Sequence, residues 1–263
     1  MTATTAGAMT RTVQVIGSPL SPYVRKVLAC LEHKGIAWQI DPIVPFFGDD
    51  AFSKLSPLRR IPVLIDADLT LADSTVICEY LDDRWPEPAL RPSDARERAR
   101  ARWLEEFADT RMGEVFVWRL FNQVVIKPAV WGEVADRALL ERAVQQEIPE
   151  ILDYLEPVLL ASPASSAGFL FGALTTADIA IAAFFRNAAF ARFEVDAQRW
   201  PTTAAYVRRV LALPCFATPT RLEDAIRRLP IAQHRAAIVK LGVAVTPHTH
   251  ATATPRRGVM STE

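Results

Sequence analysis

The sequence predicts an α/β domain followed by an all-helical domain. Two observations support this prediction. Before residue 73, short apolar runs resemble strands, and after residue 94 apolar residues recur at helical spacing. A segment at 86–93 that is rich in proline is typical of a linker between the two regions. With 263 residues, half of them hydrophobic, the chain is long enough for two such domains.

Residues 12–41 predict a strand, a helix and a second strand. The first strand is the apolar run at 13–16, and the second is the alternating segment at 36–40. The helix between them has one apolar face, made by Val24, Val27, Leu28 and Leu31. Ser21 is a good N-cap, Pro22 suits the first helical position, and Gly35 is a good stop.

Residues 42–85 predict the rest of the α/β domain. We expect a short helix near 50–55, strands at 62–65 and 69–71, and a helix that begins near Ser74. The buried face of this last helix is expected to be Val76, Ile77, Tyr80 and Leu81. The first domain is therefore expected to span residues 12–85, after a disordered leader at 1–11.

The second domain is expected at 94–232. Its predicted helices cover residues 94–122, 133–160, 176–191, 201–212 and 216–229. Pro149 should kink or split the second of these helices. Residues 233–263, which include the segment TPHTH at 246–250, are expected to form a frayed tail.

Composition narrows the possible functions. Thirty basic and thirty acidic residues give a formal net charge of zero, which does not favour a nucleic acid as a partner. No apolar run is long enough to span a membrane, and the N-terminus is not a secretory signal. Three scattered cysteines fit neither a disulfide framework nor a thiol-based metal site and suggest a reducing compartment, so we expect a cytoplasmic protein without a metal.

Four motifs, taken in order, resemble those of the cytosolic glutathione S-transferase superfamily. Residues 18–26 (SPLSPYVRK) open the first helix, residues 56–64 (SPLRRIPVL) are similar to the family's N-P-x-x-K-V-P-x-L signature, and residues 71–77 (LADSTVI) are similar to its E/D-S-x-x-I signature. Residues 175–180 (TTADIA) resemble a capping motif of its helical domain. Ser56 and Arg60 depart mildly from the second signature, which has Asn and Lys there. The resemblance covers residues 12 to about 230.

The resemblance implies a thioredoxin-like N-terminal domain, an all-helical C-terminal domain, glutathione as co-substrate and a homodimer. A thiol titrates near ~8.5 in water, so a transferase must lower that pKa to make the nucleophile. The start of a helix favours an anion, and a hydroxyl can donate to the charged sulfur. We favour Ser21 for this role, at a serine-type site, with Ser18 as the alternative.

The resemblance also implies how glutathione is held. Ile61 and Pro62 would form a cis-proline turn that presents backbone groups to the cysteinyl part. Asp73 and Ser74, at a helix start, would hold the γ-glutamyl carboxylate and ammonium. Arg60 would bind the glycyl carboxylate, and Lys54 is a weaker candidate for that role. Each of these residues also has an ordinary structural interpretation as a cap, a turn or a solvated charge.

The second substrate is expected to be a small, largely apolar electrophile bound between the domains. Its pocket would be lined by Tyr23, Phe46, Phe47, Trp103, Phe107, Trp118 and Phe121. Arg111 or Arg119 could reach it. Two alternatives stay open: glutathione-dependent isomerisation or peroxide reduction at the same site, and a non-catalytic protein that binds a partner. Disulfide exchange is disfavoured, because no cysteine lies at the start of the first helix.

Overall fold

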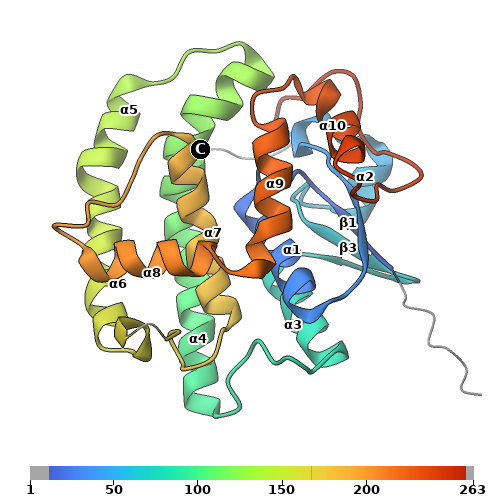
Figure 1. Ribbon diagram of the computed structural model, residues 1–263. Helices are drawn as coiled ribbons and strands as arrows, with labels where there is room; N and C mark the ends of the chain where they lie inside the picture. The colour runs from blue at the N-terminus through green and yellow to red at the C-terminus, as the bar shows by residue number, and fades with distance from the viewer. Residues whose placement is uncertain (1–11, 167, 259–263) are drawn as a thin grey trace, which may run out of the picture.

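The computed structural model describes residues 12–166 and 168–258 and has the two domains that the sequence predicts (Figure 1). The predicted leader at 1–11 lies outside the described residues. In the described part of the N-terminal domain, four strands form one mixed sheet in the order β2-β1-β3-β4. The strands are β1 (Val13–Ile16), β2 (Trp38–Asp41), β3 (Val63–Asp66) and β4 (Leu69–Ala72). The helices of this domain are α1 (Pro22–Lys34), η1 (Pro45–Phe47), α2 (Asp50–Leu55) and α3 (Ser74–Arg84).

The sheet register places several loops at one edge. Ile16 pairs with Asp41 in parallel and with Val63 in antiparallel orientation, and Val63 also pairs with Ala72. The carboxyl ends of β1, β2 and β4 and the amino end of β3 therefore meet at the same edge. The segments that hold the predicted glutathione-binding residues all begin or end there.

The first helix begins and ends as the sequence predicts. Pro22 occupies the first turn, and Gly35 ends the helix in the left-handed region at φ 64°. The expected buried face of α3 is partly wrong, because Val76 is 47% exposed, while Ile77, Cys78 and Leu81 are buried. The helix is rotated so that Cys78 faces α1 in place of Val76.

The helical domain is built around a long first helix. Its elements are α4 (Ala95–Phe107), η2 (Ala108–Trp131), α5 (Arg137–Arg142), η3 (Ala143–Glu147), α6 (Ile148–Leu160), η4 (Pro163–Ser166), α7 (Thr176–Phe190), α8 (Pro201–Leu211), η5 (Pro214–Phe216), α9 (Ala217–Ile226), η6 (Ile231–Gln233) and α10 (His234–Lys240). The helix that starts as α4 continues through η2, whose turns are of the wider π type, beyond the predicted end near residue 122. It ends at Gly132, which adopts a left-handed φ of 65°.

Two predictions about this domain concern prolines and caps. Pro149 lies in the first turn of α6, directly after the π-type turns of η3. The predicted helix at 133–160 therefore changes there from π-type to α-helical turns.

Thr175 and Asp178 form the expected capping box at the start of α7. Asp178 also accepts hydrogen bonds from the Leu170 backbone at 2.9 Å and the Tyr206 hydroxyl at 2.7 Å. It therefore joins α7 to α8 in the core.

Residues 233–258 are ordered, contrary to the expectation of a frayed tail. After α10, residues 243–258 (the C-terminal strap) run along the exposed edge of β2 and then over η1 (Figure 1). Ile40 donates to Ala244 at 3.0 Å and accepts from Thr246 at 3.1 Å, and farther along Thr252 donates to Phe47 at 2.6 Å. The strap supplies hydrogen bonds that an edge strand otherwise lacks.

A buried carboxylate anchors the C-terminal strap. Asp41, at the end of β2, is fully buried and accepts from the Thr249 hydroxyl and the His250 backbone at 2.7 Å each. Arg235 of α10 pairs with the same carboxylate at 3.2 Å.

In the described part of the chain, no helix is both long enough and apolar enough to cross a membrane.

Candidate functional site

The start of α1 has a free hydroxyl. Ser21 is the N-cap residue, but its side chain makes no capping hydrogen bond and has no hydrogen-bond partner among the described residues. Ser18, the alternative, is 4% exposed, and its oxygen accepts from the Leu20 backbone at 3.4 Å. The turn is closed by a backbone hydrogen bond of 3.0 Å from Ser21 to Ser18. Ser21 is therefore partly exposed and available at the positive end of the helix dipole.

The Ile61–Pro62 peptide bond is cis, as the resemblance implies. The turn lies against the end of β1 at Gly17. A Cβ atom on Gly17 would lie 2.6 Å from Val24 and 2.9 Å from Ile61, and Gly17 has a φ of 147°. Only glycine fits this position, because a side chain would separate the cis-proline turn from the start of α1.

Asp73 and Ser74 lie where β4 meets α3. Asp73 is exposed and caps α3, accepting from the backbone of Thr75 at 2.9 Å and of Val76 at 3.3 Å. Its φ of 85° is unusual for a residue with a side chain and often marks a functional position. Ser74 is 3% exposed in the first turn of the helix. The Thr75 and Val76 donors are used by this cap, so the pair presents a carboxylate and the first residue of α3 at the same sheet edge as Ser21 and the cis-proline turn.

The neighbouring arginines have different roles. Arg60 is exposed and has no ion-pair partner among the described residues. Arg59 is buried and donates to the carbonyls of Pro45 at 3.3 Å and Gly48 at 2.6 Å. Arg59 thus holds the loop after β2, whereas Arg60 can meet a ligand. Sequence reasoning singled out Arg60 and missed Arg59.

A buried ionic cluster lies one turn into α1. Lys26 is 1% exposed and pairs with Glu105 at 3.0 Å and Asp109 at 2.5 Å, and it donates to Thr75 at 3.1 Å. Burial alone would lower the pKa of Lys26, but the two carboxylates outweigh burial and raise that pKa above its ordinary value. The cluster joins α1 and α3 to the long first helix of the other domain.

A second buried cation was also missed. Arg25 is 1% exposed, forms an ion pair with Glu223 of α9, and donates to Asn187 of α7 at 2.7 Å. Asn187 in turn donates to the carbonyl of Leu20 at 3.0 Å. The loop that carries Ser21 is therefore held by the helical domain. One feature of the sequence could have indicated that Arg25 and Lys26 are buried: both lie between Val24 and Val27, which belong to the buried helix face.

Most of the side chains expected around the electrophile have other partners. Tyr23 donates to the carbonyl of Asp109 at 2.8 Å, and burial, reinforced by the Asp109 carboxylate, raises the pKa of Tyr23. Arg111 and Arg119 pair with glutamates of their own domain. Trp103 donates to Tyr154, and Phe107 and Phe121 pack on aromatic rings of α6 and α7. Phe46 does line a cavity, at the end of η2.

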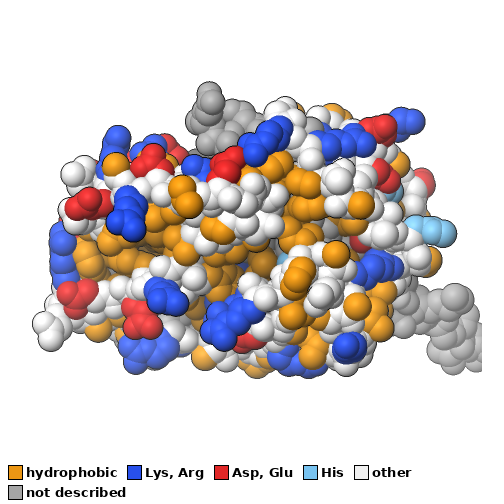
Figure 2. Space-filling view, turned by 90° about the horizontal axis from the view of Figure 1, so that it is seen from above, with side chains coloured by type: hydrophobic (Ala, Val, Ile, Leu, Met, Phe, Trp, Pro, Cys, Tyr) orange, Lys and Arg blue, Asp and Glu red, His pale blue; other side chains and the backbone are white. Residues whose placement is uncertain are grey.

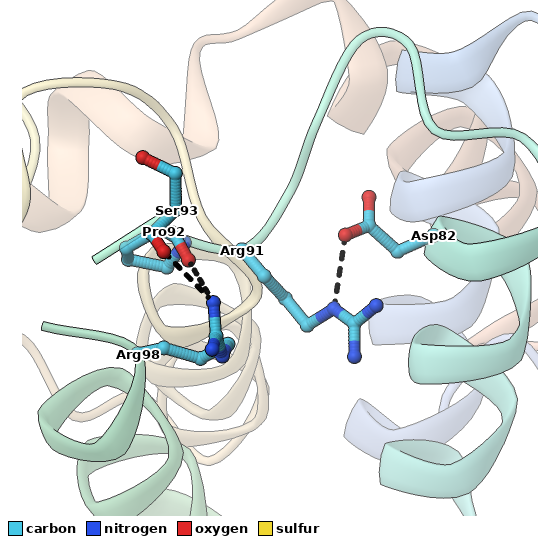
Figure 3. A pocket seen from close by; sticks show the side chains of 5 residues that line it. All are labelled: Asp82, Arg91, Pro92, Ser93 and Arg98. Atoms are coloured by element: carbon cyan, nitrogen blue, oxygen red, sulfur yellow. Dashed lines mark hydrogen bonds and ion pairs between the residues drawn. The ribbon is translucent and has the colours of Figure 1, made fainter. Parts of the chain in front are cut away.

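A cavity of about 290 Å³ lies away from these residues, where the linker meets α3 and α4 (Figure 3). Arg91 reaches back to Asp82 at 3.0 Å, and Arg98 donates to the carbonyls of Pro92 and Ser93 at 3.0 Å each. Burial alone would raise the pKa of Asp82, but hydrogen bonds from Lys34, Arg91 and the Leu90 backbone lower it below its ordinary range. The cavity is therefore a linker anchor whose charges are already paired.

Seen from above, hydrophobic side chains gather in a hollow band over the helical half of the molecule, with charged groups along its margins (Figure 2). The described residues contain no group of three or more His, Cys, Asp or Glu side chains that could hold a metal ion.

Two family models match the chain. Residues 15–89 match the glutathione S-transferase N-terminal domain, and residues 128–218 match the glutathione S-transferase C-terminal domain. Together the two matches cover well over half of the chain. The chain belongs to the glutathione S-transferase superfamily. Its sheet and helices have the thioredoxin-like and all-helical arrangement of that superfamily.

Individual relatives match over shorter stretches. Glutathione S-transferase U13 of Arabidopsis thaliana is 32% identical over 108 residues, which are 40% of this chain and 48% of the relative. A stringent starvation protein A homolog of Haemophilus ducreyi is 40% identical over 70 residues, 27% of this chain and 33% of the relative. The chain spans about half or less of the length of such curated relatives.

Solved structures match over most of the chain. A glutathione S-transferase from Rhodospirillum rubrum F11 has a TM-score of 0.74 at 25% identity and covers 86% of this chain and 99% of its own. FzlA from C. crescentus has the same TM-score and coverage at 22% identity, which shows a common fold. The match covers nearly the whole of each of these two solved structures and 86% of this chain.

Proposed function

We propose that this superfamily member is a glutathione transferase with a serine-type site. The observation that carries the proposal is the Ser21 hydroxyl, which lies at the positive end of α1 and is not used for capping. A hydroxyl in this place can donate to a thiolate, and the helix dipole favours the same charge. Both effects lower the pKa of a bound thiol.

The residues around Ser21 suit the rest of glutathione. The cis turn at Ile61–Pro62 supplies backbone groups for the cysteinyl part, and the exposed Asp73 carboxylate can pair with the γ-glutamyl ammonium. The Ser74 hydroxyl and backbone N–H, at the start of α3, suit the γ-glutamyl carboxylate. Arg60 is unpaired within the described chain and can meet the glycyl carboxylate.

The reaction follows from these roles. The glutathione thiol releases its proton to water while Ser21 and the helix start stabilise the thiolate. The sulfur then donates an electron pair to the electrophilic carbon and forms a carbon–sulfur bond. The leaving group departs with the electron pair of its former bond. Here the chain acts by tuning the thiol pKa and by positioning the two substrates.

Glutathione titration tests this proposal. Isothermal titration of the wild type should show binding, and Asp73→Ala should weaken it by about 1.5–3 kcal/mol, the usual size of a charge-assisted hydrogen bond. Asp68→Ala, in the exposed turn between β3 and β4, is the matched control and should leave binding unchanged. No binding at millimolar glutathione would rule out the transferase proposal, and unchanged affinity in Asp73→Ala would leave Asp73 as a cap only.

A non-catalytic role is the second candidate, because some matching relatives are named stringent starvation protein A homologs rather than transferases. Turnover discriminates between the two candidates, since a protein that only binds partners would bind glutathione weakly or not at all and conjugate nothing. Isomerisation and peroxide reduction share the proposed site, and assays with an isomerisable substrate or a peroxide would distinguish them from conjugation.

We also propose a cytoplasmic location, because the three cysteines are free and buried.

A further inference from the structure

Asn187 of α7 bonds to the carbonyl of the residue that precedes Ser21. Its side chain is fully buried and uses both ends of the amide. The Nδ2 group donates to the carbonyl of Leu20 at 3.0 Å, and the Oδ1 atom accepts from Arg25 of α1 at 2.7 Å. The reversed amide would place N–H groups against the guanidinium, so only one orientation satisfies both neighbours. Because α7 stands beside α1, Asn187 joins the helical domain to the loop that carries Ser21 (Figure 1).

This hydrogen bond fixes the peptide plane that leads into Ser21. The carbonyl oxygen of Leu20 and the amide nitrogen of Ser21 belong to the same planar peptide group. Asn187 holds the oxygen end, and at the nitrogen end the Ser21 amide donates to the carbonyl of Ser18 at 3.0 Å. With both ends held, the peptide cannot rotate without breaking a hydrogen bond. Ser21 is thereby kept at a φ of −75° and a ψ of 130°, the extended conformation of an N-cap residue.

Asn187 is itself held by buried ionic contacts. Arg25 also donates to the carbonyl of Ala183, one turn earlier in α7, at 2.5 Å, and it forms an ion pair with Glu223 of α9. Glu223 is fully buried and also pairs with Arg186 of α7 at 2.8 Å. The Asn187 amide therefore belongs to a network of three helices, and the Leu20 carbonyl is tied to that network rather than to a mobile side chain.

A small rotation of the peptide would change the chemistry at Ser21. Helix α1 does not require the contact with Asn187, because its first hydrogen bond starts at the carbonyl of Ser21, from the amide of Arg25 at 2.9 Å. The Ser21 side chain is short and makes no capping hydrogen bond, so its direction follows the backbone. A hydrogen bond weakens steeply when its donor is misaligned. The position of Asn187 therefore controls whether the hydroxyl faces a bound thiolate.

We propose that Asn187 is a positioning residue for the Ser21 hydroxyl. The inference rests on the proposed function, and it assigns to Asn187 an effect on the glutathione thiol that passes through Ser21 alone. Loss of the Asn187 donor should raise the pKa of the bound thiol. It should leave the affinity for the rest of glutathione unchanged, because Asp73, Ser74 and the cis-proline turn are not part of this network.

The main variant is Asn187→Leu, which removes the amide at a similar volume and adds no charge. Titration of thiolate absorbance with glutathione bound should show a thiol pKa roughly one unit above that of the wild type. S-methylglutathione, which has no thiol to ionise, should bind as tightly as it binds to the wild type. In the Ser21→Ala background the same change should raise the pKa no further, because a residue that acts through Ser21 then has no hydroxyl to position.

Two further variants keep the test decisive. Asn187→Asp keeps an acceptor for Arg25 and removes the donor to Leu20, and it replaces Asn187→Leu if circular dichroism shows that the leucine variant does not fold. The Ser21→Ala/Asn187→Asp double variant then measures the part of the pKa change that the added charge causes by itself.

Asn122→Leu is the matched control. Asn122 is the other asparagine of the chain, is 7% exposed, and makes no hydrogen bond to residues 18–21 in the described part of the chain. Its substitution should leave the thiol pKa unchanged even where it lowers the melting temperature, which separates positioning from a general loss of stability.

Amide hydrogen exchange, followed by NMR without ligand, separates this proposal from the proposed function. Exchange at the Ser21 amide, which bonds to Ser18, should be faster in the Asn187 variants than in the wild type. Unchanged exchange, an unchanged thiol pKa, or a pKa change that persists in full in Asn187→Leu without the Ser21 hydroxyl would each overturn the proposal. If glutathione does not bind to the wild type but exchange is faster, the transferase fails and the hold of Asn187 on the peptide before Ser21 stands.

Discussion

At the scale of single residues, the start of α1 decides whether the site can work. Two serines lie within one turn of each other, and their environments differ. Ser18 is buried and accepts a backbone hydrogen bond, whereas Ser21 is partly exposed and its hydroxyl has no partner in the described chain. A thiol activator must donate to a bound ligand, and both hydroxyls keep their O–H donor. The greater exposure of Ser21 therefore favours Ser21.

Ser21→Ala should raise the pKa of glutathione's thiol in the complex by roughly one to two units, because a charge-assisted hydrogen bond of about 1.5–3 kcal/mol is lost. The measurement is a titration of thiolate absorbance with glutathione bound, in wild type, Ser21→Ala and Ser18→Ala. A shift in Ser18→Ala alone would assign the role to Ser18. A shift in neither would leave activation to the helix start, and melting curves must show that each variant is folded.

Residue patterns predicted Ser21 and Asp73 at helix starts, whereas the cis bond at Ile61–Pro62 followed only from the family resemblance, because an X–Pro bond is rarely cis. The burial of Arg25 and Lys26 was not predicted, although both lie between Val24 and Val27 of the buried helix face. Their partners come from α9 and from the start of η2, distant in sequence, and charged residues are normally solvated. Only the fold shows that these cations are buried and paired.

At the scale of elements, periodicity located most strands and helices, and the C-terminal strap was the main error. Its Thr, His and Pro residues carry no apolar pattern, so its order depends on the unpaired edge of β2 and on the buried carboxylate of Asp41. The extension of η2 past residue 122 was also missed, because the β-branched residues 124–126 and Pro128 do not favour a helix, although Gly132 is a good stop.

Deletion of residues 243–263 should lower the free energy of unfolding by about 1–3 kcal/mol, since several hydrogen bonds each contribute about 0.5–1.5 kcal/mol before the lost order of the strap is counted. It should also promote self-association, because β2 becomes a bare edge. Urea unfolding and light scattering measure the two effects. Deletion of residues 259–263 alone is the control, and equal stability of both truncations would contradict the assigned role.

At the scale of the whole molecule, the superfamily fold suggests a pair of chains. We expect a homodimer, because the family this chain resembles usually forms one and two-fold dimers are the commonest oligomers. Multi-angle light scattering should give twice the 29.2 kDa mass of one chain at working concentration. A mass of a single chain across the accessible concentration range would refute this prediction.

The two domains of one chain are joined by the Lys26 cluster, and its removal should weaken the whole molecule. Lys26→Met leaves the Glu105 and Asp109 carboxylates buried without their cation, which typically costs about 3–5 kcal/mol. Lys240→Met, in the last turn of α10, is a matched exposed control and should cost little. Urea unfolding at neutral pH measures both variants, and a loss below about 1 kcal/mol in Lys26→Met would show that the cluster contributes little.

The pH dependence of that loss identifies its cause. Burial raises the pKa of Asp109, and Lys26 opposes this effect. Without Lys26 the folded-state pKa of Asp109 rises further above its unfolded value. A group with a raised folded-state pKa favours folding at low pH and loses that contribution as pH rises through the folded value. The stability gap between wild type and Lys26→Met should therefore narrow as pH falls from 7.5 toward 5. A constant gap would instead point to lost packing of the lysine stem.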